Sequence, residues 1–299
     1  MMKIFLLLVK RNIKLFFNDK GMFLTSLITP MILLVLYVTF LGNVYRDSFV
    51  QNFPPNIVSD KVIDGLVSGQ LISSILAVSC ITVAFCSNFL SVQDKALGNI
   101  KDLTISPVKP NVLSLSYYFA SLVSTLIICL TALAVCLVYV AITGWYMNFS
   151  DVMLLILDVI LLVLFGTILS SIINMFLSTL GQISAVGTIV SSVYGFICGA
   201  YMPLSSFPIG LQKVLSFLPG TYGTSLVREH SMRGALAAVE AEGLPQTHID
   251  SVKDAMDCNI YFFGTEVTEL TKFIILIITI VVLIGIYLLL NKFYKKKAR

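Results

Sequence analysis

Six long apolar runs dominate the chain, and short polar segments separate them. Each run is long enough for an α-helix to cross the hydrocarbon core of a bilayer, which takes about 20 residues. The predicted spans are residues 22–41, 66–92, 113–142, 152–180, 183–202 and 270–290. The pattern therefore predicts an all-α polytopic membrane protein, in which residues 1–299 form a single domain with six transmembrane helices.

Residues 1–20, before the first span, have an amphipathic pattern. On a helical projection the polar side chains gather on one face, and the apolar side chains spread over the rest. The polar face consists of Lys3, Lys10, Arg11, Lys14 and Asn18. This pattern is typical of a helix that lies in the membrane interface. Alternatively, residues 1–20 are an ordinary positively charged flank of the first span.

The polar segment 93–112 interrupts the apolar pattern between the second and third spans. Gly98 and Asn99 can begin a short helix, and Pro107 and Pro110 end it, because proline lacks an amide hydrogen and restricts the residue before it. Three apolar residues give this helix a hydrophobic side: Ile100, Leu103 and Ile105. The segment thus predicts a compact docking element of about two helical turns.

Residues 203–269, before the last span, form the longest polar region. Its first part is apolar enough to dip into the bilayer, yet prolines interrupt it. Broken helices survive at membrane depth only when they are buried in protein or face a cavity. We therefore expect two short re-entrant or interfacial helices between Met202 and Glu229, followed by a small external cap in residues 230–264.

The composition excludes a soluble globular protein. Charged residues make up 12% of the chain, whereas they are about a quarter of an ordinary soluble domain. Thirteen of the 20 lysines and arginines lie in residues 1–20, 93–112 and 291–299. Because basic residues are retained on the cytoplasmic side, this bias predicts a cell-membrane protein with both termini in the cytoplasm. No basic patch interleaved with aromatic residues points to nucleic acid.

The sequence contains no catalytic or nucleotide-binding motif, so the chain is not expected to be an enzyme. Neither a GxxxxGK[ST] phosphate loop nor a GxSxG nucleophile motif is present. His230 and His248 lie 18 residues apart without a nearby cysteine spacing, which favours exposed polar residues over a metal site. Five of the six cysteines lie in apolar runs and are expected to act as small apolar side chains.

Asp158 is the one acidic side chain well inside an apolar run. A charge at membrane depth costs several kcal/mol unless it is paired or hydrated, so Asp158 is a candidate functional residue. The alternative is that it lies near the outer interface, where it snorkels to water or caps a neighbouring helix. With a single such residue, the sequence predicts no buried relay of several ionisable groups.

Small and polar side chains mark faces of the fourth and fifth spans. Such faces permit close contact between helices. Alternatively, they line a substrate path. The candidate path residues are Asp158, Asn174, Ser191 and Tyr194. Apart from Asp158, these apolar, serine-rich faces lack charged residues, which suits an amphipathic or lipid-like substrate better than a highly charged polymer.

The segment 93–112 carries the first of two motifs that resemble the permease subunits of ABC-2-type ATP-binding-cassette exporters. In that family a glycine is followed by a leucine and then by a Ser/Thr-Pro pair. The matching residues are Gly98, Leu103, Ser106 and Pro107. The resemblance implies that this loop is the coupling helix, which docks into a cytoplasmic ATPase subunit. Asn99 stands in place of the usual threonine, and Lys101 stands in place of a common acidic residue.

The second motif follows the fifth span, where the family has a proline-rich re-entrant region that ends in a proline, an aromatic residue and an arginine. The matching residues are Pro203, Pro208, Pro219, Tyr222 and Arg228. The resemblance implies that they form a re-entrant gate region. Gly220 stands where the family usually has an apolar residue, and residues 230–264 form a longer insertion than the simplest members have.

The resemblance covers essentially the whole chain and implies an exporter permease, powered by ATP hydrolysis in a separate subunit. ATP and Mg would be bound by that partner ATPase, and this chain would hold no cofactor. A second permease subunit, identical or paralogous, and membrane lipid are the other expected partners.

The expected substrate is an amphipathic or lipophilic compound, such as a drug, an antibiotic or a lipid-like molecule. Export of a polysaccharide or teichoic acid is the alternative within the family. A non-transporting membrane sensor or assembly factor, and a secondary transporter or channel, are the alternatives outside it.

Overall fold

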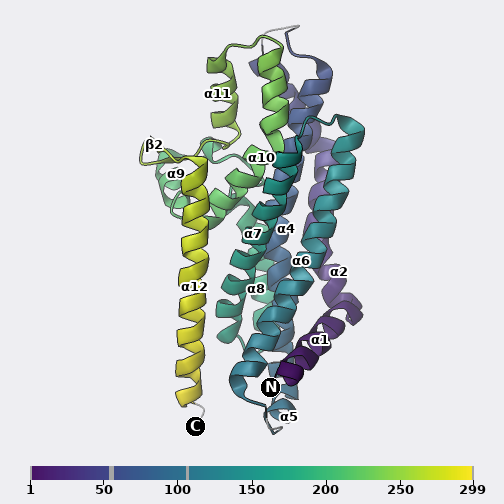
Figure 1. The fold of residues 1–299 in the computed structure, drawn as a ribbon, viewed down its shortest axis with the longest axis vertical. Coiled ribbons are helices and arrows are strands. Elements are labelled where there is room, and N and C mark those ends of the chain that lie inside the picture. The colour runs from purple at the N-terminus through teal and green to yellow at the C-terminus, as the bar shows by residue number, and fades with distance from the viewer. Residues whose placement is uncertain (1, 54–56, 106–107, 298–299) are drawn as a thin grey trace.

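Six helices in the described part of the computed structural model are long and apolar enough to cross a membrane. The structure describes residues 2–53, 57–105 and 108–297, and most of them are helical. The long helices run along one bundle axis, and both chain ends lie at the same end of it, as Figure 1 shows. The all-α polytopic fold class that the apolar runs predict is confirmed.

The elements follow one another as a chain of helices with one small hairpin. The first half contains α1 (Met2–Asn18), α2 (Lys20–Leu36), the π-helical turn η1 (Tyr37–Leu41), α3 (Gly42–Asn52), α4 (Asp60–Ala96), α5 (Asn99–Ile105) and α6 (Pro110–Thr143). The second half contains α7 (Phe149–Met175), α8 (Leu180–Ile197), the 3-10 turn η2 (Leu204–Ser206), α9 (Ile209–Leu215), α10 (Pro219–Ala241), α11 (Gln246–Ala255) and α12 (Glu269–Lys297). The antiparallel strands are β1 (Tyr261–Phe262) and β2 (Thr265–Glu266).

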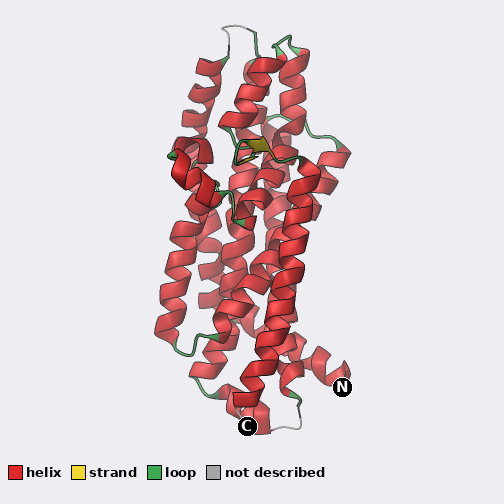
Figure 2. Cartoon of the chain, turned by 90° about the vertical axis from the view of Figure 1, so that its left-hand side faces the viewer, coloured by secondary structure: helices red, strands yellow, loops and turns green. Residues whose placement is uncertain are grey.

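The two ends of the bundle differ in what they carry (Figure 1). One end carries both chain termini and α5, and we call it the terminal end. The opposite end carries α3 and α11, and we call it the cap end. The hairpin of β1 and β2, together with α9, lies beside the first turns of α12, below the top of the cap (Figures 1 and 2).

Helix α4 forms the centre of the bundle and is buried along almost its whole length. It packs against α2, α6, α7, α8 and α10. A Cβ atom on Gly69 would lie 2.7 Å from the carbonyl oxygen of Ser231, and the Ser231 hydroxyl donates to the Gly69 carbonyl at 2.9 Å. Small residues therefore let α10 approach α4 closely, which is how membrane helices gain packing energy in a solvent as apolar as their side chains.

Helix α1 lies obliquely across the terminal end rather than along the bundle axis (Figures 1 and 2). It packs against α6 and α2. Asn12 and Phe16 are buried against the bundle, while Leu6 and Leu7 are exposed. The helix thus has one side that contacts protein and another with free apolar residues, an arrangement typical of an interfacial helix.

Some helix ends differ from the predicted span limits. Residues 152–180 read as one apolar run, but α7 ends at Met175 and α8 begins at Leu180. A capping box sets the start of α8, since Thr179 accepts from the amide of Gln182 while the Gln182 side chain accepts from the amide of Thr179. The first span, in contrast, is longer than predicted, because α2 continues without a break through η1 into α3.

The prediction of two short helices between Met202 and Glu229 is only half right. The first corresponds to η2 and α9, which are short. The second is wrong, because α10 begins at Pro219 and continues to Ala241. Proline at the first helical position starts a helix without losing a hydrogen bond, and no proline follows it within α10. One continuous helix therefore runs from the segment after α9 into the cap end.

Candidate functional site

The turn between α4 and α5 depends on Gly98. Its φ of +81° lies in the left-handed region that favours glycine, and no atom lies within 4 Å of the position a Cβ would take. Helix α5 begins directly after it, at Asn99, and includes the backbone of Lys101. Ser106 and Pro107, which complete the predicted docking motif, lie outside the described residues.

A buried carboxylate, Asp94, ties this turn to three other helices. It accepts hydrogen bonds from the Tyr117 hydroxyl at 2.5 Å, from the Asn99 side chain at 2.9 Å and from Arg11 at 3.0 Å. Its partners come from α6, α5 and α1, so the position of α5 is fixed relative to the ends of two spans and the oblique helix. No pattern in the sequence singles out Asp94, because its partners Arg11 and Tyr117 are distant along the chain.

Two apolar side chains of α5, Leu103 and Ile105, have different surroundings. Leu103 is half-buried and packs against Leu90, Leu113 and Tyr117. Ile105, in contrast, is 84% exposed. Leu103 therefore holds α5 against the bundle, and Ile105 is the apolar side chain that is free to contact another molecule.

A cavity of 540 Å³ lies between α2, α4 and α8. Its walls are mostly apolar and include two aromatic side chains, Phe85 and Phe89. Hydroxyl groups are spaced along it: those of Thr25, Thr29, Thr82, Ser184, Thr188 and Ser191. Among the described lining residues, Asp19 at the terminal end is the one charged side chain. The cavity can accommodate an apolar molecule that carries a few hydrogen-bonding groups.

The four predicted path residues do not gather at one site. Ser191 lines the cavity between α2, α4 and α8, but Asn174 lines a separate space of 250 Å³ near the terminal end. The hydroxyl of Tyr194 is buried without a hydrogen-bond partner in the described structure, and it is the nearest atom to the position of a Cβ on Gly220. Asp158 lies in a different environment again, toward the cap end.

Seven ionisable side chains of α7, α10 and α12 form a charge cluster toward the cap end. Its members are Asp151 and Asp158 of α7, Glu229, His230 and Arg233 of α10, and Glu269 and Lys272 of α12. At its centre, His230 Nδ1 lies 2.5 Å from Asp158 Oδ2 and His230 Nε2 lies 3.0 Å from Glu269 Oε1. A protonated imidazole can donate to both carboxylates at once.

The two permanent cations of the charge cluster connect α12 to α10. Arg233 donates to Glu269 at 2.8 Å, and Lys272 donates to Glu229 at 2.9 Å and to the Cys258 carbonyl at 2.6 Å. Lys272 is buried although it belongs to the last span. Since α12 touches little else than α7 and α10, these ion pairs secure its cap-end turns.

Three expectations from the sequence differ from the structure. The sequence predicts no buried relay of several ionisable groups, but the charge cluster buries four of them: Asp151, Asp158, His230 and Lys272. It also predicts that His230 is an exposed polar residue, whereas its side chain is fully buried. The alternative in which Asp158 snorkels to water is wrong, because Asp158 is 1% exposed and faces His230. The partners are 72 residues apart, too far for a single sequence to pair them.

The surroundings of His230 favour its charged form. Burial alone would lower the pKa of the imidazole, but its hydrogen bonds and charge interactions with Asp158, together with the hydrogen bond to Glu269, raise the pKa above its ordinary value. No group of three or more side chains suited to holding a metal ion is present in the described part of the chain. The arrangement is therefore an ion-pair network between helices.

Arg228, from the second predicted motif, is fully buried and holds two segments together. It donates to the carbonyl oxygens of Gly199 and Met256, both at 2.7 Å, and lies 3.4 Å from the Asp257 carboxylate. Asp257 also accepts from the backbone amide of Leu204, at the start of η2. Arg228 thus connects the end of α8, the start of η2 and the segment after α11.

The other predicted gate residues mark helix starts and contacts in the same region. Pro203 and Pro208 directly precede η2 and α9, and Pro219 is the first residue of α10. Tyr222 is buried, and its hydroxyl donates to the Ser216 carbonyl at 2.5 Å. This contact folds the end of α9 back onto α10.

Comparison with known families agrees with this geometry. The family model described as ABC-2 type transporter matches residues 3–230, from α1 into the middle of α10. No curated protein and no solved structure shows a comparable match. The matched region includes five of the six spans, the Gly98 turn and Arg228. The chain belongs to the ABC-2 type transporter family and is the membrane-spanning permease subunit of an ABC-type transporter.

Proposed function

We propose that this permease exports an amphipathic or lipophilic compound, such as a drug, an antibiotic or a lipid-like molecule, and that a separate ATPase subunit supplies the energy. The cavity between α2, α4 and α8 is the observation that carries the proposal. Its walls combine apolar side chains with scattered hydroxyls, and its described lining has no tyrosine or tryptophan for sugar stacking. An amphipathic molecule fits such walls better than a polysaccharide or teichoic acid does.

The terminal end is the proposed cytoplasmic side and the ATPase-docking side. Lysine and arginine are concentrated in the segments at this end, as expected for a cytoplasmic face. Here α5 offers Ile105 as an exposed apolar anchor, with Asn99 and Asp102 also exposed beside it. In this proposal ATP and Mg bind to the partner, and α5 passes the partner's movement to α4.

Replacing Ile105 by glutamate tests the docking proposal. A charge in place of an apolar anchor is expected to cost about 2 kcal/mol of binding free energy, or about 30-fold in affinity. The measurement is co-purification of the ATPase with tagged permease from membranes, together with the ATPase activity of the complex. Ile105→Leu is the matched control and should retain the partner. Unchanged co-purification by the Ile105→Glu variant would contradict this contact.

Filling the cavity tests the path. Ser184→Trp places an indole where Ser184 lines the cavity, while Ala185→Trp adds the same group one residue along α8, at an exposed position outside the lining. We expect Ser184→Trp to reduce ATP-dependent export of lipophilic compounds at least about tenfold, a loss of roughly 1.4 kcal/mol, and Ala185→Trp to reduce it far less. Equal export by both variants would place the path elsewhere. The assay uses vesicles that contain the permease and its ATPase.

A second permease subunit, identical or paralogous, completes the proposed path. Helices α2 and α8, which border the cavity, are the spans with least buried surface apart from α12. Exposed side chains of α8 include Ile189, Val193 and Phe196. Packing these helices against a second subunit would cover them and enclose the cavity between two chains. A two-fold pair achieves this with the same surface on both subunits.

A further inference from the structure

The hairpin of β1 and β2 and the residue Phe217 after α9 form an exposed patch of aromatic side chains. Phe263 and Gly264 have φ of +49° and +89°, so the two-residue turn is of the type that matches the twist of paired strands. The turn places Phe262 and Phe263 beside Phe217, which follows α9. The ring centroids of Phe217 lie 5.2 Å from Phe262 and 5.8 Å from Phe263. We call these three side chains the aromatic patch.

Much of the aromatic patch is uncovered in the single chain. Phe217 is 61% exposed and Phe263 is 59% exposed. The neighbouring surface of α9 is apolar too, because Ile209, Leu211 and Val214 are exposed. In water, a contiguous apolar surface of this kind would be a site of aggregation or association. The patch therefore requires a partner that accepts aromatic rings.

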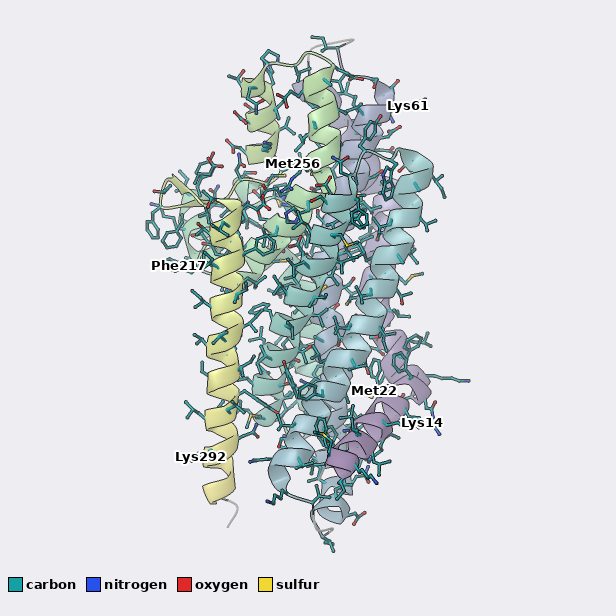
Figure 3. All side chains as sticks on the ribbon, in the orientation of Figure 1. Lys14, Met22, Lys61, Phe217, Met256 and Lys292 are labelled. Atoms are coloured by element: carbon teal, nitrogen blue, oxygen red, sulfur yellow. The ribbon has the colours of Figure 1, made fainter. Side chains whose placement is uncertain are left out.

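The position of the patch identifies that partner. The segments on either side of the hairpin are pinned to the bundle, since Ile260 and Val267 pack with Tyr222 of α10 and Ile275 of α12. Figure 3 shows Phe217 projecting sideways next to the cap-end turns of α12. Directly beyond the hairpin begins α12, which is long and apolar enough to cross a membrane and whose first turns expose apolar residues: Leu270, Ile274, Ile277 and Ile278. The patch is thus continuous with a surface that lies in the bilayer.

The chemistry of the patch also fits the boundary between headgroups and acyl chains. Interfacial helices bury Trp, Phe and Leu side chains at this depth. Lys213 Nζ lies 5.8 Å from the centroid of the Phe263 ring, and a lysine at this level can extend its ammonium to lipid phosphates. We infer that the hairpin of the insertion is a membrane anchor, which seats the aromatic patch and α9 in the leaflet at the cap end.

Tryptophan fluorescence tests the anchor in the full-length permease. The chain has a single tryptophan, Trp145, so Phe263→Trp in a Trp145→Phe background gives one reporter. The protein is reconstituted in phosphatidylcholine vesicles whose acyl chains carry bromine, a contact quencher. We expect the reporter to lose most of its emission when bromine lies near the headgroup end of the chain, and less when it lies near the chain terminus.

A matched reporter on the cap is the control. His248→Trp in the same background lies at an exposed cap position and should respond to aqueous iodide but not to brominated lipid. Phe217→Trp is a second reporter for the patch if Phe263→Trp does not yield a monodisperse protein. Patch reporters that brominated lipid leaves unquenched overturn the inference: iodide quenching would then indicate water, and resistance to both quenchers would indicate coverage by a second subunit or another protein.

Discussion

Replacing Arg228 by leucine is expected to destabilise the permease by about 3–5 kcal/mol, the usual cost of removing one partner from a buried ion pair. The loss has two parts. The Asp257 carboxylate is left buried without its cation, and the carbonyl oxygens of Gly199 and Met256 lose donors at 2.7 Å. Thermal unfolding of the detergent-purified permease, followed by the monodisperse fraction after heating, measures the effect.

Two further variants separate the parts of this loss. Arg228→Lys keeps the charge but cannot reach both carbonyl oxygens and the carboxylate, because an ammonium lacks the planar fork of a guanidinium. Asp257→Asn in the Arg228→Leu background removes the unpaired charge and should restore part of the stability. A wild-type melting temperature for Arg228→Leu would show that the contacts of Arg228 contribute little, and no restoration in the double variant would mean that the carbonyl contacts dominate.

Replacing His230 by leucine is expected to cost a similar amount, about 3–5 kcal/mol, because it leaves Asp158 buried without a partner. Asp158 Oδ1 already lacks a hydrogen bond in the described structure, so the carboxylate depends on His230 alone. Changing both residues to leucine removes the buried charge and should be less harmful than His230→Leu by itself. If the double variant is as unstable as the single one, the cost lies in packing and not in the unpaired charge.

The pH dependence of stability provides a second readout of this pair. The pKa of His230 is raised in the folded protein, so its contribution is fully present below the ordinary value of 6.5 and is lost as the pH rises through the folded pKa. Asp158 and Glu269 face the imidazole from α7 and α12, and Arg233, Glu229 and Lys272 complete its surroundings. His230→Gln should therefore show a flatter stability profile than the wild type as the pH rises from 6.5 through the folded pKa of His230.

Local sequence signals predicted the elements whose causes are local. Six apolar runs gave six spans, and Gly98 gave the turn before α5, since glycine readily adopts the positive φ that the turn needs. Pro219 was predicted to interrupt a helix, but it is the first residue of α10. The residues that determine the six spans and the Gly98 turn lie in or directly beside those elements, so one sequence is enough to predict them.

The parts that the sequence could not predict depend on which helices become neighbours. His230 meets Asp158 and Glu269 only because α10 packs between α7 and α12, and no spacing along the chain encodes that. The same holds for the cavity, which takes its walls from three helices and includes one of the four residues proposed for the path. Apolar periodicity identifies the buried side of a helix but not the helix that covers it.

The central position of α4 has a mechanical consequence. Its 37 residues form one helix of about 55 Å, joined at one end to the Gly98 turn and gripped near the other by α10 through Gly69 and Ser231. A helix supported on all sides along its length bends little. If the proposed ATPase docks at α5, its movement would reach the cap end as a displacement of α4 as a whole, together with the helices packed on it.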